Sequence, residues 1–581
     1  MSLSDPESKR PSQPHPILPH PVLPHWSLYV AVLLASLSVA QLLIRGGPLV
    51  GYPHELRYGE AIVLDQARRV VEEPGLYPEI DSEPWLLDQY APFYPYLAQW
   101  FGKLSDAPYW GGRMLSLIST LGSATVLTLI VRRSSGLTAG LLCGSVMLTM
   151  TEFLRFGFLM RVDPLALFLA MLGVWCHCHR RTAVRFAGAV AFFFAVYTRQ
   201  TTIALLLVSY LGLWLREGRA ALRWPVGLLA AGLLFYAILS ANTDGHFHQH
   251  AVMSNLFPFH WASGIQKWLA PFVPYKLPLF IATFLALVPG SGKGVDGARV
   301  FRIGIYLSLA VALLLCIPVL TQPGGLQWVL SAQGVLLVTA VALLFRREVD
   351  TRIDGARIVL ALSSMALIGR IGSDLNYLFE GGVLILLVCG TAIGRAPPLR
   401  AMMIGSLLVI QVLIGVYLSR DLTEFQPERL EEIEFRQRVV DRLAEFPDPV
   451  LSEEPWAVAE AGRPMVIEPF TARQMYESGM WSGEDLIDAL DARQYSAIVR
   501  AKQRVAAGYE KDQDGQIVFD PIDGMPVPYF GPWTFNHVRS LPPKIQQAID
   551  RNYQPVPRTT MIEKVTKYYL EGREIWEPIP R

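Results

Sequence analysis

Two carboxylates and an arginine gather in a short stretch that follows the first apolar segment of the chain. The stretch reads Tyr52-Pro-His-Glu-Leu-Arg-Tyr-Gly-Glu60, so that Glu55 and Glu60 flank Arg57. A positioned carboxylate can take the proton of a reacting hydroxyl, and the planar donor fork of an arginine suits a phosphate. The same residues could instead form a solvated helix face with Glu/Arg pairs. The residue types therefore allow proton transfer beside a phosphate, with a structural role as the alternative.

More polar residues follow in the same connection. Asp65 lies in a segment from Glu55 to Arg69 whose apolar spacing is helical. This helix could lie along the membrane interface. Gln89 and Tyr90 begin a second polar run farther along. All three side chains are candidates for binding a substrate.

A second acidic motif precedes another apolar segment. It reads Met160-Arg-Val-Asp-Pro164 and contains Arg161 and Asp163. Asp163 could cap a helix whose first residue is a proline. An ionisable residue at a membrane boundary is also a candidate functional residue, and one role does not exclude the other.

Two other connections between apolar segments carry few but suggestive polar groups. Arg199 is the only charge in Tyr197-Thr-Arg-Gln-Thr201, where it could reach a lipid headgroup or pair with the phosphate of a lipid-borne substrate. Asp374 and Asn376 lie in the connection that begins at Gly372, and they form a polar group at the mouth of the predicted bundle.

Three histidines alternate in the chain at His246, His248 and His250. On a β-strand this spacing would place three imidazoles on one face, where they could hold a metal ion. No partner carboxylate is visible in the sequence, so we predict no metal site.

Apolar segments must position these residues, because 52% of the 581 residues are hydrophobic and only 17% are charged. A soluble chain would carry about a quarter of charged residues. We predict a polytopic α-helical membrane protein with about thirteen transmembrane helices. The expected spans cover residues 27–45, 112–131, 136–151, 164–178, 183–198, 201–215, 224–240, 275–289, 303–319, 328–345, 357–371, 381–394 and 400–419.

The distribution of basic residues predicts the orientation. Six alternate loops hold 17 Lys and Arg residues, which places those loops in the cytosol. The N-terminus is then cytosolic, the first external loop covers residues 46–111, and the candidate residues above lie outside. Residues 1–26 are polar and rich in proline, and we expect a disordered cytosolic tail.

The chain after residue 420 has a different character. Residues 421–581 contain 19 Lys/Arg and 28 Asp/Glu, whereas the preceding part is net basic. Helical and extended patterns alternate there, with a strand expected at Met465–Ile467, and this predicts a soluble C-terminal α/β domain. With an odd number of spans, this domain is extracytosolic.

In their order, these motifs resemble the GT-C superfamily of membrane glycosyltransferases, in particular bacterial protein-mannosyltransferases and aminoarabinose transferases. The family's first external loop typically reads Asp-Glu-x-Arg-Tyr-x-Glu-x-Ala. Here the corresponding run starts at His54 and includes Glu55, Arg57, Tyr58 and Glu60. His54 replaces the family's leading aspartate, so the acid that acts as base is left open among the acids of this loop.

Other motifs carry the same resemblance from about residue 27 to the C-terminus. Arg161-Val-Asp163 is similar to the family's second acidic motif. The run Tyr197-Thr-Arg-Gln-Thr201 is similar to a separate Thr-Lys-Gly/Gln element, in which Arg199 replaces the lysine. The run from Gln89 to Pro95 is similar to a proline-rich element but lacks its phosphate-binding lysine. Asp374-Leu-Asn-Tyr matches one bacterial subgroup.

The resemblance implies transfer of a hexose or pentose from a polyprenyl-phosphate donor to a glycan, lipid or protein acceptor, with inversion at the anomeric carbon. Glu55 or Glu60, with Asp163, would supply the general base, and Arg199 would neutralise the departing phosphate. The other residues implied in substrate binding are His54, Arg57, Tyr58, Asp65, Gln89, Tyr90, Arg161, Asp374 and Asn376. A divalent metal is allowed but not required, and we expect no nucleic-acid partner.

The expected location is the inner membrane of a cell envelope, with the chain in direct contact with the bilayer. The alternative is a multi-span transporter or a flippase for lipid-linked sugars. That class predicts internal repeats and ionisable residues near the middle of the membrane. We find no repeat in the sequence, and the acids lie in connections.

Overall fold

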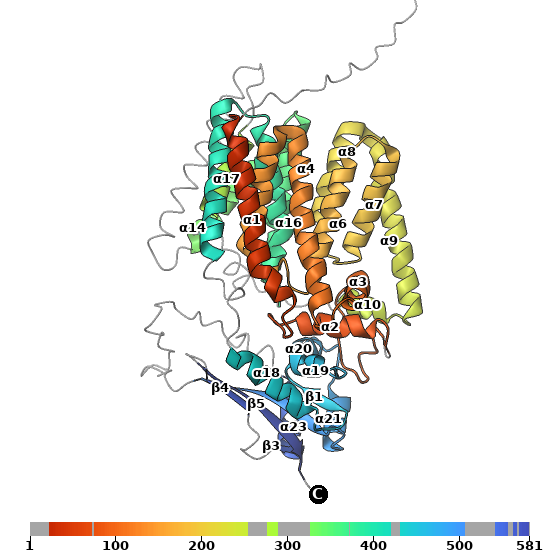
Figure 1. Cartoon of the computed structure of the whole chain (residues 1–581). Helices are drawn as coiled ribbons and strands as arrows, with labels where there is room; N and C mark the ends of the chain where they lie inside the picture. The colour runs from red at the N-terminus through yellow and green to blue at the C-terminus, as the bar shows by residue number, and fades with distance from the viewer. Residues whose placement is uncertain are drawn as a thin grey trace, which may run out of the picture.

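Figure 1 shows the protein as a computed structural model, in which a helical bundle stands above a smaller C-terminal part. The structure describes residues 23–72, 75–253, 276–288, 326–370, 372–419, 430–505, 541–555, 562–565 and 569–579. Most of the predicted N-terminal tail and the predicted span at 303–319 lie outside these residues.

The bundle is built from helices rich in Leu, Val, Ala and Gly, whose side chains are apolar nearly all round. Small residues allow close approach, as where Gly173 leaves room for the ring of Phe192. The helices of the bundle are α1 (Trp26–Val50), α4 (Trp110–Thr149), α6 (Val162–His177), α7 (Thr182–Val196), α8 (Ala204–Glu217), α9 (Arg223–Asn242), α12 (Leu277–Leu287), α14 (Leu326–Leu344), α15 (Val349–Ala366), α16 (Phe379–Ile393) and α17 (Pro398–Leu418).

Among the described residues, five helical ranges are long and apolar enough to cross a membrane. Two of them each contain two of the predicted spans, and α4 changes direction at Gly136, where φ is +86°. The chain is therefore a largely helical protein with several candidate spans, and the number thirteen stays a prediction. The five ranges are Trp26–Val50, Trp110–Thr149, Ala204–Asn242, Leu375–Ile393 and Pro398–Leu418.

Short helices lie at the end of the bundle that faces the C-terminal part (Figure 1). They are α2 (Glu60–Arg69), α3 (Phe93–Gly102), α5 (Thr151–Phe156) and α10 (His246–Ala251). Helix α2 begins five residues later than predicted, because Gly59 has φ +99° and interrupts the helix. Eight of its ten residues are buried, and it packs on α3 and on the C-terminal part. Protein therefore encloses most of this helix, and its place along the membrane interface stays a prediction.

The C-terminal part combines a mixed sheet with short helices. The strand order is β1-β2-β5-β3, with β4 also paired to β5, and only the pairing of β1 with β2 is parallel. The elements are α18 (Leu430–Leu443), β1 (Val450–Ser452), α19 (Pro455–Glu460), α20 (Pro469–Glu477), α21 (Glu484–Asp491), β2 (Ala497–Val505), α23 (Pro543–Asn552), β3 (Tyr553–Pro555), β4 (Ile562–Val565) and β5 (Tyr569–Pro578).

The segment Met465–Ile467, expected as a strand, does not join this sheet. Ile467 instead forms an isolated parallel bridge with Trp85 of the first external loop. Ile467 therefore uses its backbone groups to connect the C-terminal part to the first external loop rather than to extend the sheet.

The alternating histidines lie on helix α10, so they do not form a strand with three imidazoles on one face. In the described part of the chain, no three His, Cys, Asp or Glu side chains form a group that could hold a metal ion. His248 instead bonds to the Tyr236 hydroxyl.

His250 is fully buried and joins two separate segments. Its Nδ1 accepts a hydrogen bond from the backbone N–H of Asp88 at 2.9 Å, and its Nε2 donates to the carbonyl of Pro78 at 2.7 Å. These roles require the neutral ring, and burial lowers the pKa of His250 despite the nearby Asp88 carboxylate.

This arrangement predicts a stability that depends on pH. The folded-state pKa of His250 lies below the unfolded value of about 6.5. Its contribution is therefore complete above that pH and is lost as the pH falls below it. We expect the thermal midpoint of the wild type to drop more between pH 8 and pH 5 than that of His250→Gln, whose amide can both accept and donate. Equal drops would contradict the assignment.

Candidate active site

Three residues that the sequence placed in separate connections meet around one carboxylate. Asp163 lies in the first turn of α6, Arg199 lies between α7 and α8, and Asn376 lies in the turn before α16. Arg199 forms an ion pair with Asp163, and the Asn376 amide donates to Asp163 Oδ1 at 3.0 Å. Arg199 also covers the ring of Tyr377 at 4.3 Å. The structure thus brings these three residues together.

The second oxygen of Asp163 has a different environment. The side chain is 2% exposed, and within the described part of the chain Oδ2 has no hydrogen-bond partner. A buried carboxylate oxygen without a donor is unfavourable and rare in native structures. It borders a small void of about 20 Å³, which is room for about one water molecule. Asp163 can therefore accept a proton or a hydrogen bond without losing an existing contact.

A larger cavity of about 390 Å³ has a separate lining, and Asp163 is not among the described residues that form it. Six of the predicted residues line it, namely Arg57, Tyr58, Gln89, Tyr90, Arg161 and Asp374. Burial raises the pKa of the Tyr90 phenol, and the nearby Asp163 raises it further. Since Tyr90 lines the cavity and lies in electrostatic range of Asp163, it connects the two parts of the site.

Arginines supply positive charge on two sides of the cavity. Arg57 pairs with Asp374 at 2.6 Å. Arg161 donates to the carbonyl of Tyr58, and its guanidinium lies against Gly59. A Cβ at Gly59 would lie 2.8 Å from Nη1 of Arg161, so glycine is needed there for space as well as for its positive φ. Two guanidinium groups at a cavity wall can hold an anion such as a phosphate.

Glu60 lies behind the cavity and is fully buried. Arg113 donates to both of its oxygens, at 2.9 and 2.8 Å, and the backbone N–H groups of Leu56 and Met160 complete its contacts. Burial alone would raise the pKa of Glu60, but Arg113 outweighs this effect and lowers it. Glu60 is held as an ionised, fully bonded partner of Arg113.

Glu55 and His54 contact the C-terminal part. Oε1 of Glu55 accepts from the N–H groups of Gly59 and Ala61 at 2.8 and 3.1 Å. Glu460 accepts from the backbone N–H of Glu55 at 2.7 Å and bonds to the His54 ring at 2.8 Å. Burial raises the pKa of Glu55 to about 7, in spite of Arg436. Neither residue is among the described residues that line the cavity.

Asp65 also lies outside the lining that the structure describes. It faces Arg69 at 2.7 Å, and Arg69 binds both oxygens of Asp88. Arg69 outweighs the effect of burial and lowers the pKa of Asp88 to about 2. This buried network braces the first external loop.

Some residues of the cavity were not expected from the sequence as site residues. They are Gln66, Glu468, Phe470 and Thr471, and the last three come from the C-terminal part. The pair Glu468-Pro469 is a helix-start signal that could have located α20. Nothing in the sequence pairs this helix with the first external loop.

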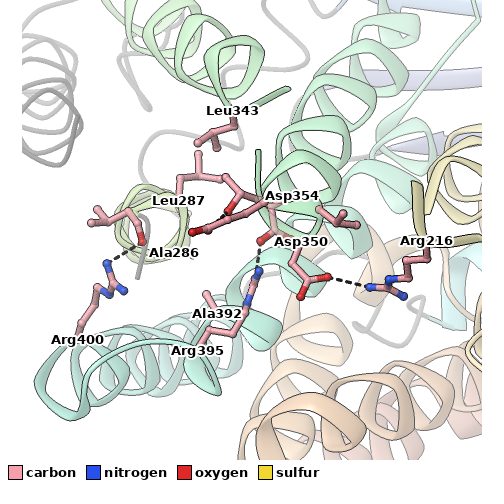
Figure 2. Close-up of a pocket in the computed structure, with 13 residues that line it drawn as sticks. Arg216, Ala286, Leu287, Leu343, Asp350, Asp354, Ala392, Arg395 and Arg400 are labelled. Carbon is pink, nitrogen blue, oxygen red and sulfur yellow. Dashed lines mark hydrogen bonds and ion pairs between the residues drawn. The ribbon is translucent and has the colours of Figure 1, made fainter. Parts of the chain in front are cut away.

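Another cavity, of about 530 Å³, lies at the opposite ends of α15 and α16 (Figure 2). Its charged side chains contact one another or the backbone. Arg216 pairs with Asp350 at 2.9 Å, Arg395 pairs with Asp354, and Arg400 donates to the carbonyl of Val288. These basic residues belong to loops predicted to be cytosolic, and the cavity holds none of the predicted site residues.

The fold and the site together define a polytopic helical protein that has a carboxylate–arginine centre at one end of its bundle, beneath a C-terminal cover. No protein-family model matches the chain, and no curated protein matches it either.

Solved structures of two membrane glycosyltransferases are similar to the chain. ArnT from Cupriavidus metallidurans shares 13% identity in the apo state, with 83% of this chain and 95% of that one covered and a TM-score of 0.40. The same protein bound to undecaprenyl phosphate shares 12% identity, with 83% of this chain and 96% of that one covered and a TM-score of 0.40. The Archaeoglobus fulgidus oligosaccharyltransferase in the apo form shares 11% identity, with 82% of this chain and 69% of that one covered and a TM-score of 0.45. Both are GT-C glycosyltransferases, the superfamily that the motifs resemble. Likeness at these TM-scores does not by itself assign an activity.

The Glu60–Arg113 pair predicts a large loss of stability on neutralisation. Glu60→Gln leaves a buried guanidinium without a counter-charge, and we expect it to cost about 3–5 kcal/mol. As control, Glu445→Gln breaks the more exposed pair with Arg442 and should cost less than about 1 kcal/mol. Thermal midpoints of the purified variants measure the difference. Similar midpoints for both variants would refute the structural role.

Glu55 predicts an opposite pH dependence. Its folded pKa of about 7 lies above the unfolded value, so the folded state is penalised as the pH rises from about 4.5 to 7. Glu55→Gln keeps an oxygen for the N–H groups of Gly59 and Ala61 but cannot ionise. The thermal midpoint of this variant relative to wild type should rise between pH 5 and pH 8. A constant difference would show that Glu55 is not held protonated.

Proposed function

We propose that the protein transfers a sugar from a polyprenyl-phosphate donor to an acceptor hydroxyl at the outer end of its bundle. The observation that supports this most is the environment of Asp163, whose Oδ1 is fixed by Arg199 and Asn376 while Oδ2 has no described partner. A carboxylate beside an arginine and next to a cavity combines a proton acceptor with a phosphate-binding group.

In the proposed reaction, the acceptor oxygen attacks the anomeric carbon from the face opposite the phosphate. Asp163 takes the hydroxyl proton as the new C–O bond forms. The bond between the anomeric carbon and the phosphate oxygen breaks, and the polyprenyl phosphate leaves with the electron pair. A single displacement of this kind inverts the anomeric centre.

The arginines have separate roles in this proposal. Arg199 holds Asp163 in place and, with Arg161, faces the charge that develops on the leaving phosphate. Arg57 is fixed by Asp374 at the rim, where it can orient the donor. His54 acts indirectly, because it connects the loop to Glu460.

Glu55 is the other candidate base. A carboxylate with a pKa of about 7 suits proton transfer near neutral pH. Glu55 accepts two backbone hydrogen bonds and contacts Glu460 of the C-terminal part, whereas Asp163 is paired with Arg199, which can bind a phosphate, and we therefore assign the base to Asp163.

The proposal includes an arrangement in the membrane. About thirteen spans would carry the site to the extracytosolic face of the inner membrane, with the N-terminus in the cytosol. Residues 421–581 would form an extracytosolic α/β domain over the site. The basic loops at the end of the bundle shown in Figure 2 support this orientation.

Separate substitutions of the two acids test the assignment. Asp163→Asn should lower sugar transfer by about 10²–10⁴-fold, because the general base is removed. Glu55→Gln should keep most of the activity. Asp350→Asn, which breaks an ion pair at the opposite end of the bundle, is the matched control and should have no effect.

The measurement compares envelope glycans and lipids by mass spectrometry, in deletion cells that express each variant. A sugar-sized mass difference should appear with wild type and Asp350→Asn and be absent with Asp163→Asn. A product that persists with both Asp163→Asn and Glu55→Gln would refute carboxylate catalysis. Uptake of lipid-linked sugar into vesicles without any transfer would favour the transporter class.

A further inference from the structure

One wall of the large cavity comes from the C-terminal part of the chain. Glu468, Phe470 and Thr471 line it together with residues of the first external loop. We propose that this wall binds the acceptor and that the acceptor presents a carbohydrate ring to it. This inference rests on the proposed function, and it narrows the class of acceptor from a glycan, lipid or protein to a saccharide headgroup.

Glu468 fixes the wall to the bundle. Its side chain is 1% exposed and accepts hydrogen bonds from the N–H groups of Phe470 and Thr471 at 3.0 and 2.7 Å, which caps α20. The phenol of Tyr58 also donates to this carboxylate. Tyr58 belongs to the loop that carries Arg57, so the position of the wall is coupled to that of the cationic side of the cavity.

Phe470 is held against a backbone that leaves no space for a larger residue. A Cβ at Gly372 would lie 2.5 Å from Cζ of the Phe470 ring, and the φ of +78° at Gly372 also requires glycine. The ring therefore has a defined place beside Asp374 at the cavity rim.

The polar groups that line this cavity include hydrogen-bond donors, among them Arg57 and Arg161, as well as acceptors. Oε1 of Gln66 has no partner within the described residues, although the side chain is 2% exposed. Asp374 and Glu468 add carboxylate oxygens, which can each accept more than one hydrogen bond. The cavity thus offers both donors and acceptors beside an aromatic ring.

A sugar ring matches this combination. It carries several hydroxyl donors around a ring with an apolar face, and that face can pack on an aromatic side chain such as Phe470. Each sugar hydroxyl can both donate and accept a hydrogen bond, whereas a peptide brings one backbone N–H and one C=O per residue. The volume of 390 Å³ lies within the range of small-molecule pockets, about 300–1,000 Å³.

The test uses the full-length chain in lipid nanodiscs and saturation-transfer NMR. The probes are methyl glycosides of glucose, galactose, mannose and N-acetylglucosamine, with N-acetylserine methylamide as the peptide probe. Phe470→Leu removes the ring. Tyr476→Leu is the matched control, because Tyr476 lies on the same helix and is absent from the described lining.

We expect at least one glycoside to bind wild type and Tyr476→Leu, and to bind Phe470→Leu about fivefold more weakly. Glu468→Gln gives a second, independent measurement at the same wall, and thermal midpoints confirm that each variant is folded. Absence of glycoside binding to wild type, equal binding to wild type and Phe470→Leu, or binding of the peptide probe alone would each overturn the inference.

Binding of undecaprenyl phosphate to the same nanodiscs reports on the donor separately. If undecaprenyl phosphate binds and no glycoside does, the acceptor inference fails while the proposed function stands. If a glycoside binds at Phe470 and undecaprenyl phosphate does not bind, the proposed donor fails instead.

Discussion

The ion pair between Arg113 and Glu60 is the interaction on which the geometry of the site depends. Both side chains are fully buried. Arg113 also donates to the carbonyls of Leu49 and His54, and Glu60 accepts from the N–H of Met160. One pair therefore ties the end of α1, the first external loop, the start of α4 and the segment before α6 to a single point. Because breaking a buried pair costs several kcal/mol, these four segments cannot move apart independently.

This anchoring separates the carboxylates of the loop by role. Both oxygens of Glu60 accept hydrogen bonds from Arg113 and from backbone N–H groups. Asp65 is paired with Arg69. Asp163 retains a fully buried oxygen without a described partner. The cations show a similar division, since Arg113 and Arg69 are structural while Arg57 and Arg161 border the cavity. Similar residue types thus differ in chemistry because of what surrounds them.

The sequence predicted the parts of the site that depend on local pattern. Asp163 before a proline marked a helix start, and the short connections that hold Arg199 and Asn376 were assigned to one face, where the structure brings all three together. The sequence could not show that Glu60 pairs with Arg113, 53 residues away, because this pairing depends on how the segments pack. The alternating histidines that end at His250 lie on a helix, because an alternating pattern of three residues cannot distinguish a strand from a helical turn. Likewise, Met465–Ile467 was expected as a strand, and the sequence could not show that Ile467 bridges Trp85, because alternation does not identify the neighbouring segment.

The contact between Glu460 and the first external loop has a consequence for how the protein is made. The loop emerges early in synthesis. The carboxylate that bonds to its His54 ring and to the backbone N–H of Glu55 belongs to Glu460, about 400 positions later. Glu468 and Phe470, which complete the cavity wall, arrive later still. A chain whose translation has reached only the last helix of the bundle would hold its acids and arginines without the wall that encloses them. Closure of the cavity is thus tied to synthesis of the chain through Thr471.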